Sequence, residues 1–206
     1  FSQGFSALCL AISAVSFVLF EVFKMVVIAM KINFSSKVLL KAKIEETLEC
    51  YKNHNIFPEI YILDTGSTDK TLDVVRRWSE KHPLTRVKID EQPFVDFSTS
   101  RNVVLQRIYN ESPCEFIISI DCNDELREQE KCAMMLTRYY HCPTFFIDQV
   151  WKSQGIDPIT FTNIRIVKNN GLYLWKYRVH EVLMYKFGES PIIVRLPKDI
   201  HLYQYR

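Results

Sequence analysis

The chain has 206 residues, of which 26 are basic and 24 acidic, for a formal net charge of +2. A chain of this length forms one domain by default and can bury roughly 70% of its unfolded surface without a disulfide or a structural metal. The near balance of charge and the lack of clustered Lys/Arg stripes argue against a nucleic-acid partner.

The cysteines are spread along the chain without a Cys-x-x-Cys pair, which argues against zinc ribbons and redox motifs. Several lie in apolar or helical contexts, so we expect free thiols and a reducing compartment, although an even count also permits disulfides. The six are Cys9, Cys50, Cys114, Cys122, Cys132 and Cys142.

Residues 1–24 form an apolar segment ahead of the expected domain. Phe1 to Phe20 carries no charge and approaches the roughly 20 apolar residues that span a bilayer. It lacks a basic region before it and a small-residue cleavage site, which argues against a signal peptide. Only Glu21 to Lys24 separate it from the first expected strand. A membrane anchor, an upstream extension, a fragment boundary and a packed helix all stay open, and so does a cytoplasmic or membrane-associated location.

From residue 25 to residue 140 the chain alternates between strand-like and helix-like segments. Near-continuous apolar runs indicate buried strands, whereas an apolar stripe at a spacing of three to four residues indicates helices. The alternation predicts a parallel α/β sheet with right-handed crossovers. The expected strands are Met25–Met30, Glu59–Leu63, Arg86–Ile89 and Phe116–Ile120, and the expected helices are Lys37–Asn53, a second one stopped by Pro83, Ser98–Tyr109 and Arg127–Tyr140.

After Pro143 the pattern changes to β-like segments with Gly and Asn between them. This shift predicts a mixed or antiparallel extension that completes the same domain, which would run from residue 25 to residue 206. The expected strands here are Thr144–Trp151, Phe161–Lys168, Leu172–Tyr177 and Ile192–Leu196.

Two of the buried strands run directly into acidic turns. Asp64-Thr-Gly-Ser-Thr-Asp69 follows one, and Asp121-Cys-Asn-Asp-Glu125 follows the other. In open α/β sheets the ligand crevice lies beyond the carboxyl ends of the strands, so both turns would face it. Hard oxygen ligands hold Mg²⁺ or Mn²⁺, which makes a divalent cation with a phosphate-bearing ligand the most economical interpretation. The alternatives without a ligand are a turn that only caps the next helix, for Asp64 to Asp69, and an acidic turn exposed to solvent, for Asp121 to Glu125.

Further candidates lie outside these turns. Arg101, with Asn102 beside it, places a guanidinium fork for phosphate oxygens early in a helix, although an isolated arginine is more often a surface ion pair. His180 and Glu181 could supply a general base, and His201 a metal ligand. A lone histidine is more often structural than catalytic.

Taken together, these segments resemble the family 2 glycosyltransferases, nucleotide-sugar enzymes of the GT-A fold. Asp64 to Asp69 resembles their Asp-x-Gly-Ser-x-Asp turn, and Asp121 to Glu125 lies where their Asp-x-Asp metal motif is expected. Asp96 to Asn102 resembles the Asp-Phe-Ser-x-x-Arg-Asn segment of one branch, and Trp175 to Glu181 its Trp-x-x-x-Val-His-Glu segment. His201 matches a later histidine. The resemblance covers about residues 25 to 206.

Two departures from the family pattern matter. The metal motif reads Asp121-Cys122-Asn123, so a neutral amide replaces one carboxylate, unless Asp124 reaches the metal instead. The first strand is followed by Lys31-Ile-Asn33 instead of Lys-Asn-Glu. Because the chain ends soon after His201, the resemblance leaves open whether a C-terminal part follows.

The resemblance implies transfer of a sugar from a nucleoside diphosphate-sugar to an acceptor hydroxyl, with inversion and with Mn²⁺ or Mg²⁺. It implies Glu181 as catalytic base with His180 in reserve, and Asp121 as a metal ligand. The acceptor, whether glycan, lipid or protein, stays open, as does membrane association. The resemblance assigns the second metal ligand to Asn123 or Asp124 and a third to His201. It assigns the nucleotide-sugar contacts to Asp64, Thr65, Gly66, Ser67, Asp69, Arg101 and Asn102, with bracing of the metal turn as the alternative role of Arg101.

Two other classes of function remain. The first is a non-catalytic GT-A domain that binds a nucleotide or glycan, which Asn123 favours. The second is a nucleotidyltransferase, which would need a Gly-rich basic loop after its first strand. The segment Asn33-Phe-Ser-Ser-Lys37 has no glycine, so this class ranks last.

Overall fold

The computed structural model of the chain describes residues 25–31, 39–190 and 192–205. Helices and strands alternate up to residue 138 and strands dominate after it, as the sequence predicts. The helices are α2 (Leu39–Cys50), α3 (Thr71–Lys81), α4 (Phe97–Glu111) and α5 (Gln129–Arg138). The strands are β1 (Met25–Lys31), β2 (Glu59–Asp64), β3 (Arg86–Glu91), β4 (Phe116–Asp121), β5 (Glu125–Leu126), β6 (Thr144–Ser153), β7 (Ile156–Lys168), β8 (Tyr173–Lys176), β9 (Val182–Tyr185), β10 (Ile193–Arg195) and β11 (His201–Tyr205).

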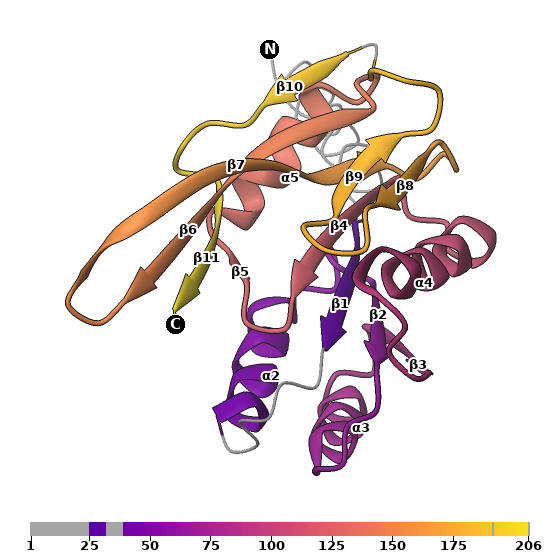
Figure 1. The fold of residues 1–206 in the computed structure, drawn as a ribbon, viewed down its shortest axis with the longest axis vertical. Helices are drawn as coiled ribbons and strands as arrows, with labels where there is room; N and C mark the ends of the chain where they lie inside the picture. Colours follow the sequence, from indigo (N-terminus) through magenta and orange to yellow (C-terminus); the bar gives the residue numbers. More distant parts are fainter. Residues whose placement is uncertain (1–24, 32–38, 191, 206) are drawn as a thin grey trace, which may run out of the picture.

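Within the described residues, nine strands form one sheet, and β8 and β9 form a separate hairpin beside it (Figure 1). The order along the sheet is β3-β2-β1-β4-β7-β6-β11-β5, with β10 paired to β6. Strands β3, β2, β1 and β4 run parallel, whereas β7 is antiparallel to β4, and β6 to β7. The fold is therefore the predicted parallel α/β sheet with a mixed extension.

The alternation of side chains along β2 and β4 builds one hydrophobic core on each face of the sheet. Ile60, Ile62, Ile118 and Ile120 face α2, α3 and α5, which contribute Leu48, Trp78 and Leu136 among others. Tyr61, Leu63 and Ile117 face α4 and the β8–β9 hairpin. Burial at roughly 25 cal/mol per Å² of apolar surface holds these layers together.

The register around β1 places the two acidic turns at one edge of the sheet. Lys31 at the end of β1 is the partner of Asp64 on β2, and Met30 is the partner of Asp121 on β4. The two aspartates therefore end the strands on either side of β1. Because all three strands are parallel, this edge is the carboxyl edge at which open α/β sheets bind ligands.

The C-terminal extension differs from the sequence prediction in its details. The prediction lacks three short strands, β5, β9 and β11, of which β5 and β11 pair with partners distant in the sequence. It also starts β7 at Phe161 instead of Ile156, and the added part contains Pro158. Proline fits there because β4 borders β7 only at Ile166–Lys168, so the edge beside Pro158 needs no N–H donor. Figure 1 shows the far end of the β6–β7 hairpin projecting away from the helices.

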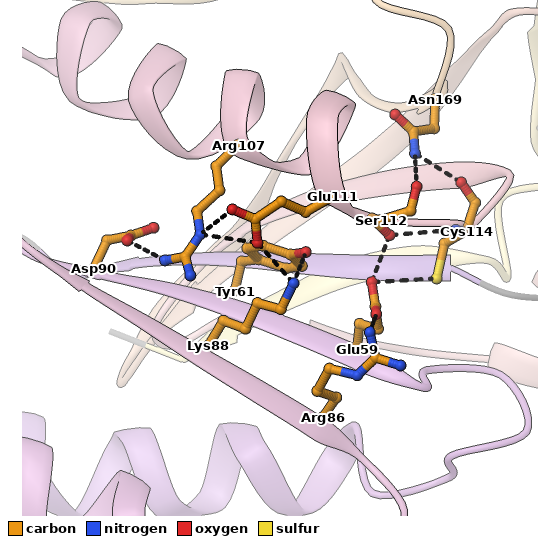
Figure 2. Close-up of polar contacts among 10 residues, drawn as sticks. All are labelled: Glu59, Tyr61, Arg86, Lys88, Asp90, Arg107, Glu111, Ser112, Cys114 and Asn169. Atoms are coloured by element: carbon orange, nitrogen blue, oxygen red, sulfur yellow. Dashed lines mark hydrogen bonds and ion pairs between the residues drawn. The ribbon is translucent and has the colours of Figure 1, made fainter.

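A polar network joins β2 and β3 to α4, and we call it the edge network (Figure 2). Arg107 on α4 pairs with Asp90 and, at 3.1 Å, with Glu111. Lys88 donates to Glu111 and to the Tyr61 hydroxyl, both at 2.8 Å. At the start of the strands Arg86 pairs at 2.6 Å with Glu59, which is 2% exposed. The charged side chains of the outermost strand β3 are thereby held against its own domain, which blunts an open sheet edge.

In the described part of the chain, no helix is both long and apolar enough to cross a membrane. Residues 1–24 lie outside the described residues, so the alternatives for that segment stay predictions. The five cysteines from Cys50 onward are free, four of them buried.

Candidate active site

The turn after β2 is organised by Asp64, which is buried. Its carboxylate accepts hydrogen bonds from the backbone N–H groups of Gly66 at 3.3 Å and Ser67 at 2.8 Å, and from the Ser67 hydroxyl. Gly66 has a φ of +104°, which strongly favours glycine, and the space around it is open. Asp69 then accepts the Thr71 N–H at 3.0 Å, at the start of α3. Asp64 therefore shapes the turn from its buried side.

The turn after β4 is held from beneath by α2. The Thr47 hydroxyl donates to the Cys122 carbonyl at 2.7 Å, and the buried Tyr51 hydroxyl donates to the Asp124 carbonyl at 3.2 Å. The Asp124 carboxylate accepts the Asp121 backbone N–H at 2.9 Å and the Gln204 amide at 3.0 Å. Asp124 is fully buried, so its carboxylate fixes the shape of the turn from inside.

Burial is the main cause that raises the pKa of Asp124 to about 7, and the neighbouring charge of Asp121 is the second cause. The guanidinium groups of Arg165 and Arg101 act in the opposite direction. The raised pKa therefore reports mainly a buried environment, with a second carboxylate close by.

Arg101 is the link between the acidic turn and the C-terminal extension. It lies in the first turns of α4, is 2% exposed, and donates through Nη2 to Asp121 at 2.6 Å. Its Nε donates to Glu181 at 3.0 Å, across 80 positions of sequence. The Asp121 side chain is 33% exposed and Glu181 is 12% exposed, so both carboxylates stay within reach of a ligand. Arg101 thus braces the acidic turn after β4 against the segment that carries Glu181.

Asn102 holds the β8 strand against α4. Its side-chain amide donates to the Trp175 carbonyl and accepts the Trp175 N–H, each at 2.8 Å, as a neighbouring strand would. Both halves of the amide are therefore used by backbone groups. The structure brings Asn102 next to the site, and its contacts there serve to position the segment that carries Glu181.

The loop between β8 and β9 delivers Glu181 to Arg101. Tyr177 and His180 adopt φ values of +71° and +55°, a conformation that few residues other than glycine adopt. His180 itself is exposed, whereas Glu181 turns inward to the guanidinium. A depression of about 350 Å³ adjoins this loop, lined by Phe94, Val95, Asp96, Phe97, Arg178 and Val179.

Arg165 on β7 is a site residue that the sequence prediction misses. It is 9% exposed, and its charge acts on Asp124. The Trp175 ring lies close to both arginines, with its centroid 4.8 Å from Arg101 Cζ and 5.5 Å from Arg165 Cζ. Within the part of the chain that the structure describes, Nη1 of each arginine and Nε1 of Trp175 are buried without a hydrogen-bond partner. The sequence signal that could have identified Arg165 is a charged residue at an inward-facing position of a strand.

The predicted metal ligands are not all brought together. Asp121, Asn123 and Asp124 share one turn, but His201 lies at the opposite end of β11 from Gln204, which contacts that turn. The His201 ring contacts the Lys198 and Asp199 carbonyls, at 3.2 and 3.1 Å. Among the described residues, no three His, Cys, Asp or Glu side chains are grouped so that they could hold a metal.

Comparison with known proteins identifies the family. Residues 38–194, more than half of the chain, match Glycosyl transferase family 2. The chain therefore belongs to glycosyltransferase family 2, and its fold is GT-A-like, as the sequence predicts.

Among solved structures, Staphylococcus aureus TarS in complex with UDP is similar, at 16% identity and a TM-score of 0.62. That match covers 89% of this chain and 60% of the TarS chain. A longer TarS structure matches at 16% identity and a TM-score of 0.59, covering 89% of this chain and 37% of that one. The chain thus spans less than two thirds of the length of these relatives. No curated protein sequence matches it.

Proposed function

We propose that this domain transfers a sugar from a nucleoside diphosphate-sugar to an acceptor hydroxyl. The observation that carries the proposal is the cluster at the carboxyl edge of β4. Its described members are three carboxylates, Asp121, Asp124 and Glu181, against two guanidinium groups, Arg101 and Arg165. Carboxyl groups that outnumber the guanidinium groups at the carboxyl edge of the sheet suit a site that takes a cation together with a diphosphate.

The donor nucleoside is assigned to the turn after β2. Asp64 keeps that turn in place, and Thr65, Ser67 and Asp69 offer hydroxyl and carboxylate groups to a base or ribose. UDP, the nucleotide bound to TarS, is the first nucleotide to test. The diphosphate would then extend from this turn across the end of β1 towards Asp121.

A divalent cation fits beside Asp121. Mg²⁺ and Mn²⁺ sites in phosphate-binding enzymes commonly use one or two carboxylates together with substrate phosphates and waters, so a three-residue protein cage is not required. The Asp121 side chain is one-third exposed, and its Oδ1 is oriented by Arg101. A bound cation supplies positive charge that offsets the charge developing on the leaving diphosphate. Arg101 holds Asp121 ready for that role.

Glu181 is the proposed general base for an inverting transfer. One carboxylate oxygen accepts from Arg101 and is fixed by it, while the other has no hydrogen-bond partner among the described residues. That second oxygen is available to take the proton of an acceptor hydroxyl. General-base help is typically worth about 10² to 10⁴ in rate. We assign the acceptor to the depression beside the β8–β9 loop, and His180 is the reserve base.

The test is a panel of nucleotide sugars screened for thermal shift and donor hydrolysis, with Mn²⁺ and with EDTA. We expect one nucleoside diphosphate-sugar to raise the melting temperature in Mn²⁺ and to be slowly hydrolysed. Asp121→Asn should strongly reduce both effects, whereas Asp90→Asn, which removes a carboxylate from the edge network, should preserve them. Donor binding without any turnover would favour the second candidate, a binding-only domain, for which Asn123 in the metal motif is the motive. Absence of binding across the panel would contradict both.

A further inference from the structure

Gln204 on β11 is tied to the acidic turn, 81 positions away from Asn123. It is 3% exposed, and its amide nitrogen donates to Asn123 Oδ1 at 2.8 Å and to Asp124 Oδ1 at 3.0 Å. Neither the family match nor the motifs assign a role to this glutamine. Its two bonds decide which side of the Asn123 amide meets a ligand.

The orientation of both amides follows from the hydrogen bonds around Gln204. Asp124 Oδ2 accepts the Asp121 backbone N–H, and the NH₂ group of Gln204 donates to Asp124 Oδ1. The same NH₂ group donates to Asn123. The atom of Asn123 at that contact must be its oxygen, so its own NH₂ group lies on the other side of the side chain.

The NH₂ group of Asn123 has no hydrogen-bond partner within the described residues, and the side chain is only half-buried. A donor in that position, two residues beyond Asp121, suits an anionic oxygen. The Asn123 oxygen is poorly suited to hold a cation, because the Gln204 N–H groups would then face the same positive charge. An amide at this position can donate a hydrogen bond to a phosphate oxygen, whereas a carboxylate there would bind the metal ion.

We propose that Asn123 donates an N–H to a phosphate oxygen of the donor's diphosphate, and that Gln204 is the positioning residue that turns it that way. This inference rests on the proposed function. It gives the departure from Asp-x-Asp a direct role: the chain exchanges one metal ligand for a direct diphosphate contact. Part of the diphosphate affinity should then persist without metal.

The experiment measures the affinity of the full chain for UDP and for inorganic pyrophosphate in EDTA by titration calorimetry. We expect Asn123→Asp to weaken both by about tenfold or more, because it removes the donor and opposes two negative groups. Asn123→Ala should weaken both by less, since it only removes the donor. The matched control is Asn169→Leu, which removes two amide hydrogen bonds to backbone at the opposite end of β4 (Figure 2).

A second measurement distinguishes a direct contact between Asn123 and phosphate from an effect of the substitutions on folding. In the wild type, the side-chain NH₂ signals of Asn123 in ¹⁵N-resolved NMR should shift when pyrophosphate is added in EDTA. Gln204→Leu should reduce both that shift and the affinity, although it leaves Asn123 in place. Wild-type affinity in Asn123→Asp, or an unmoved Asn123 signal at saturating pyrophosphate, would overturn this inference while leaving the proposed function intact. Failure of the wild type to bind any nucleoside diphosphate or pyrophosphate would overturn both.

Discussion

Helix α4 carries two arginines that make the same kind of contact in two different settings. Arg107 pairs with Asp90 on β3 and with a glutamate, Glu111, near the Tyr61 ring. Arg101 pairs with Asp121 on β4 and with another glutamate, across from the Trp175 ring. The Arg107 side chain is 31% exposed and belongs to the edge network, which holds three cations and three anions (Figure 2).

The setting of Arg101 differs in burial and in balance. It is 2% exposed, its cluster has one more carboxylate than guanidinium groups among the described residues, and one of its nitrogens is buried without a partner. Exposed ion pairs contribute little to stability, while buried ones are costly to assemble and strongly destabilising to break. The comparison shows that contact geometry alone does not identify a functional site. What distinguishes the Arg101 cluster is its burial and its greater number of carboxyl than guanidinium groups.

The largest effect is expected on the rate of transfer. Glu181→Gln should lower kcat by about 10² to 10⁴ with donor affinity little changed, because only the proton acceptor is lost. Steady-state kinetics with the donor found in the panel measures this. Glu111→Gln, the corresponding change at Arg107, should leave kcat unchanged. A loss of less than tenfold in Glu181→Gln would exclude it as the base.

The next effect concerns stability. Arg101→Met should lower the free energy of unfolding by about 3 to 5 kcal/mol, because it leaves Asp121 and Glu181 without their shared buried partner. Arg107→Met, at the more exposed position, should cost no more than about 1 kcal/mol. Urea denaturation of both variants measures the difference. Equal losses would show that the two settings are energetically alike.

A smaller effect is expected at Asn102, which holds β8 in place. Asn102→Ala should lower the free energy of unfolding by about 1 to 3 kcal/mol, since it leaves the Trp175 N–H and carbonyl without their partner. It should also lower kcat more than it raises the KM for the donor, because Glu181 is displaced. Gln106→Ala, which removes an exposed amide contact on the same helix, is the control. Unchanged kcat in Asn102→Ala would mean that β8 does not position Glu181.

The smallest effect is the pH dependence of the α4 cap. Asp96 accepts the Thr99 N–H at 2.7 Å, and this bond lowers the pKa of Asp96. A lowered folded-state pKa adds stability above the ordinary pKa of aspartate, and that stability is lost as the pH falls through the lowered value. Melting temperatures of wild type and Asp96→Asn should therefore differ most near neutral pH and converge in acid. A difference in melting temperature that widens in acid would contradict the role of Asp96 as the cap of α4.

The sequence predicted the carboxyl-edge turns because strand ends are visible locally, in apolar runs such as Glu59–Leu63 that stop at an aspartate. The long-range partners were not visible. Gln204 meets Asn123, and Asn102 meets the Trp175 backbone, across 81 and 73 positions. Arg165 gives only the weak signal of one charge inside a strand. The two-residue strand β5 exists only because β11 lies beside it, so no local pattern could predict it.

The central claim is that the unbalanced carboxylates around Arg101 hold a divalent cation together with a nucleoside diphosphate. Calorimetric titration of UDP into the chain, once with Mn²⁺ and once with EDTA, tests it most directly. We expect about tenfold or more tighter binding with Mn²⁺, because the cation offsets the charge between Asp121 and the diphosphate. Asp121→Asn should remove that difference, and Asp90→Asn should keep it. Equal UDP affinity of the wild type in Mn²⁺ and in EDTA would contradict the claim.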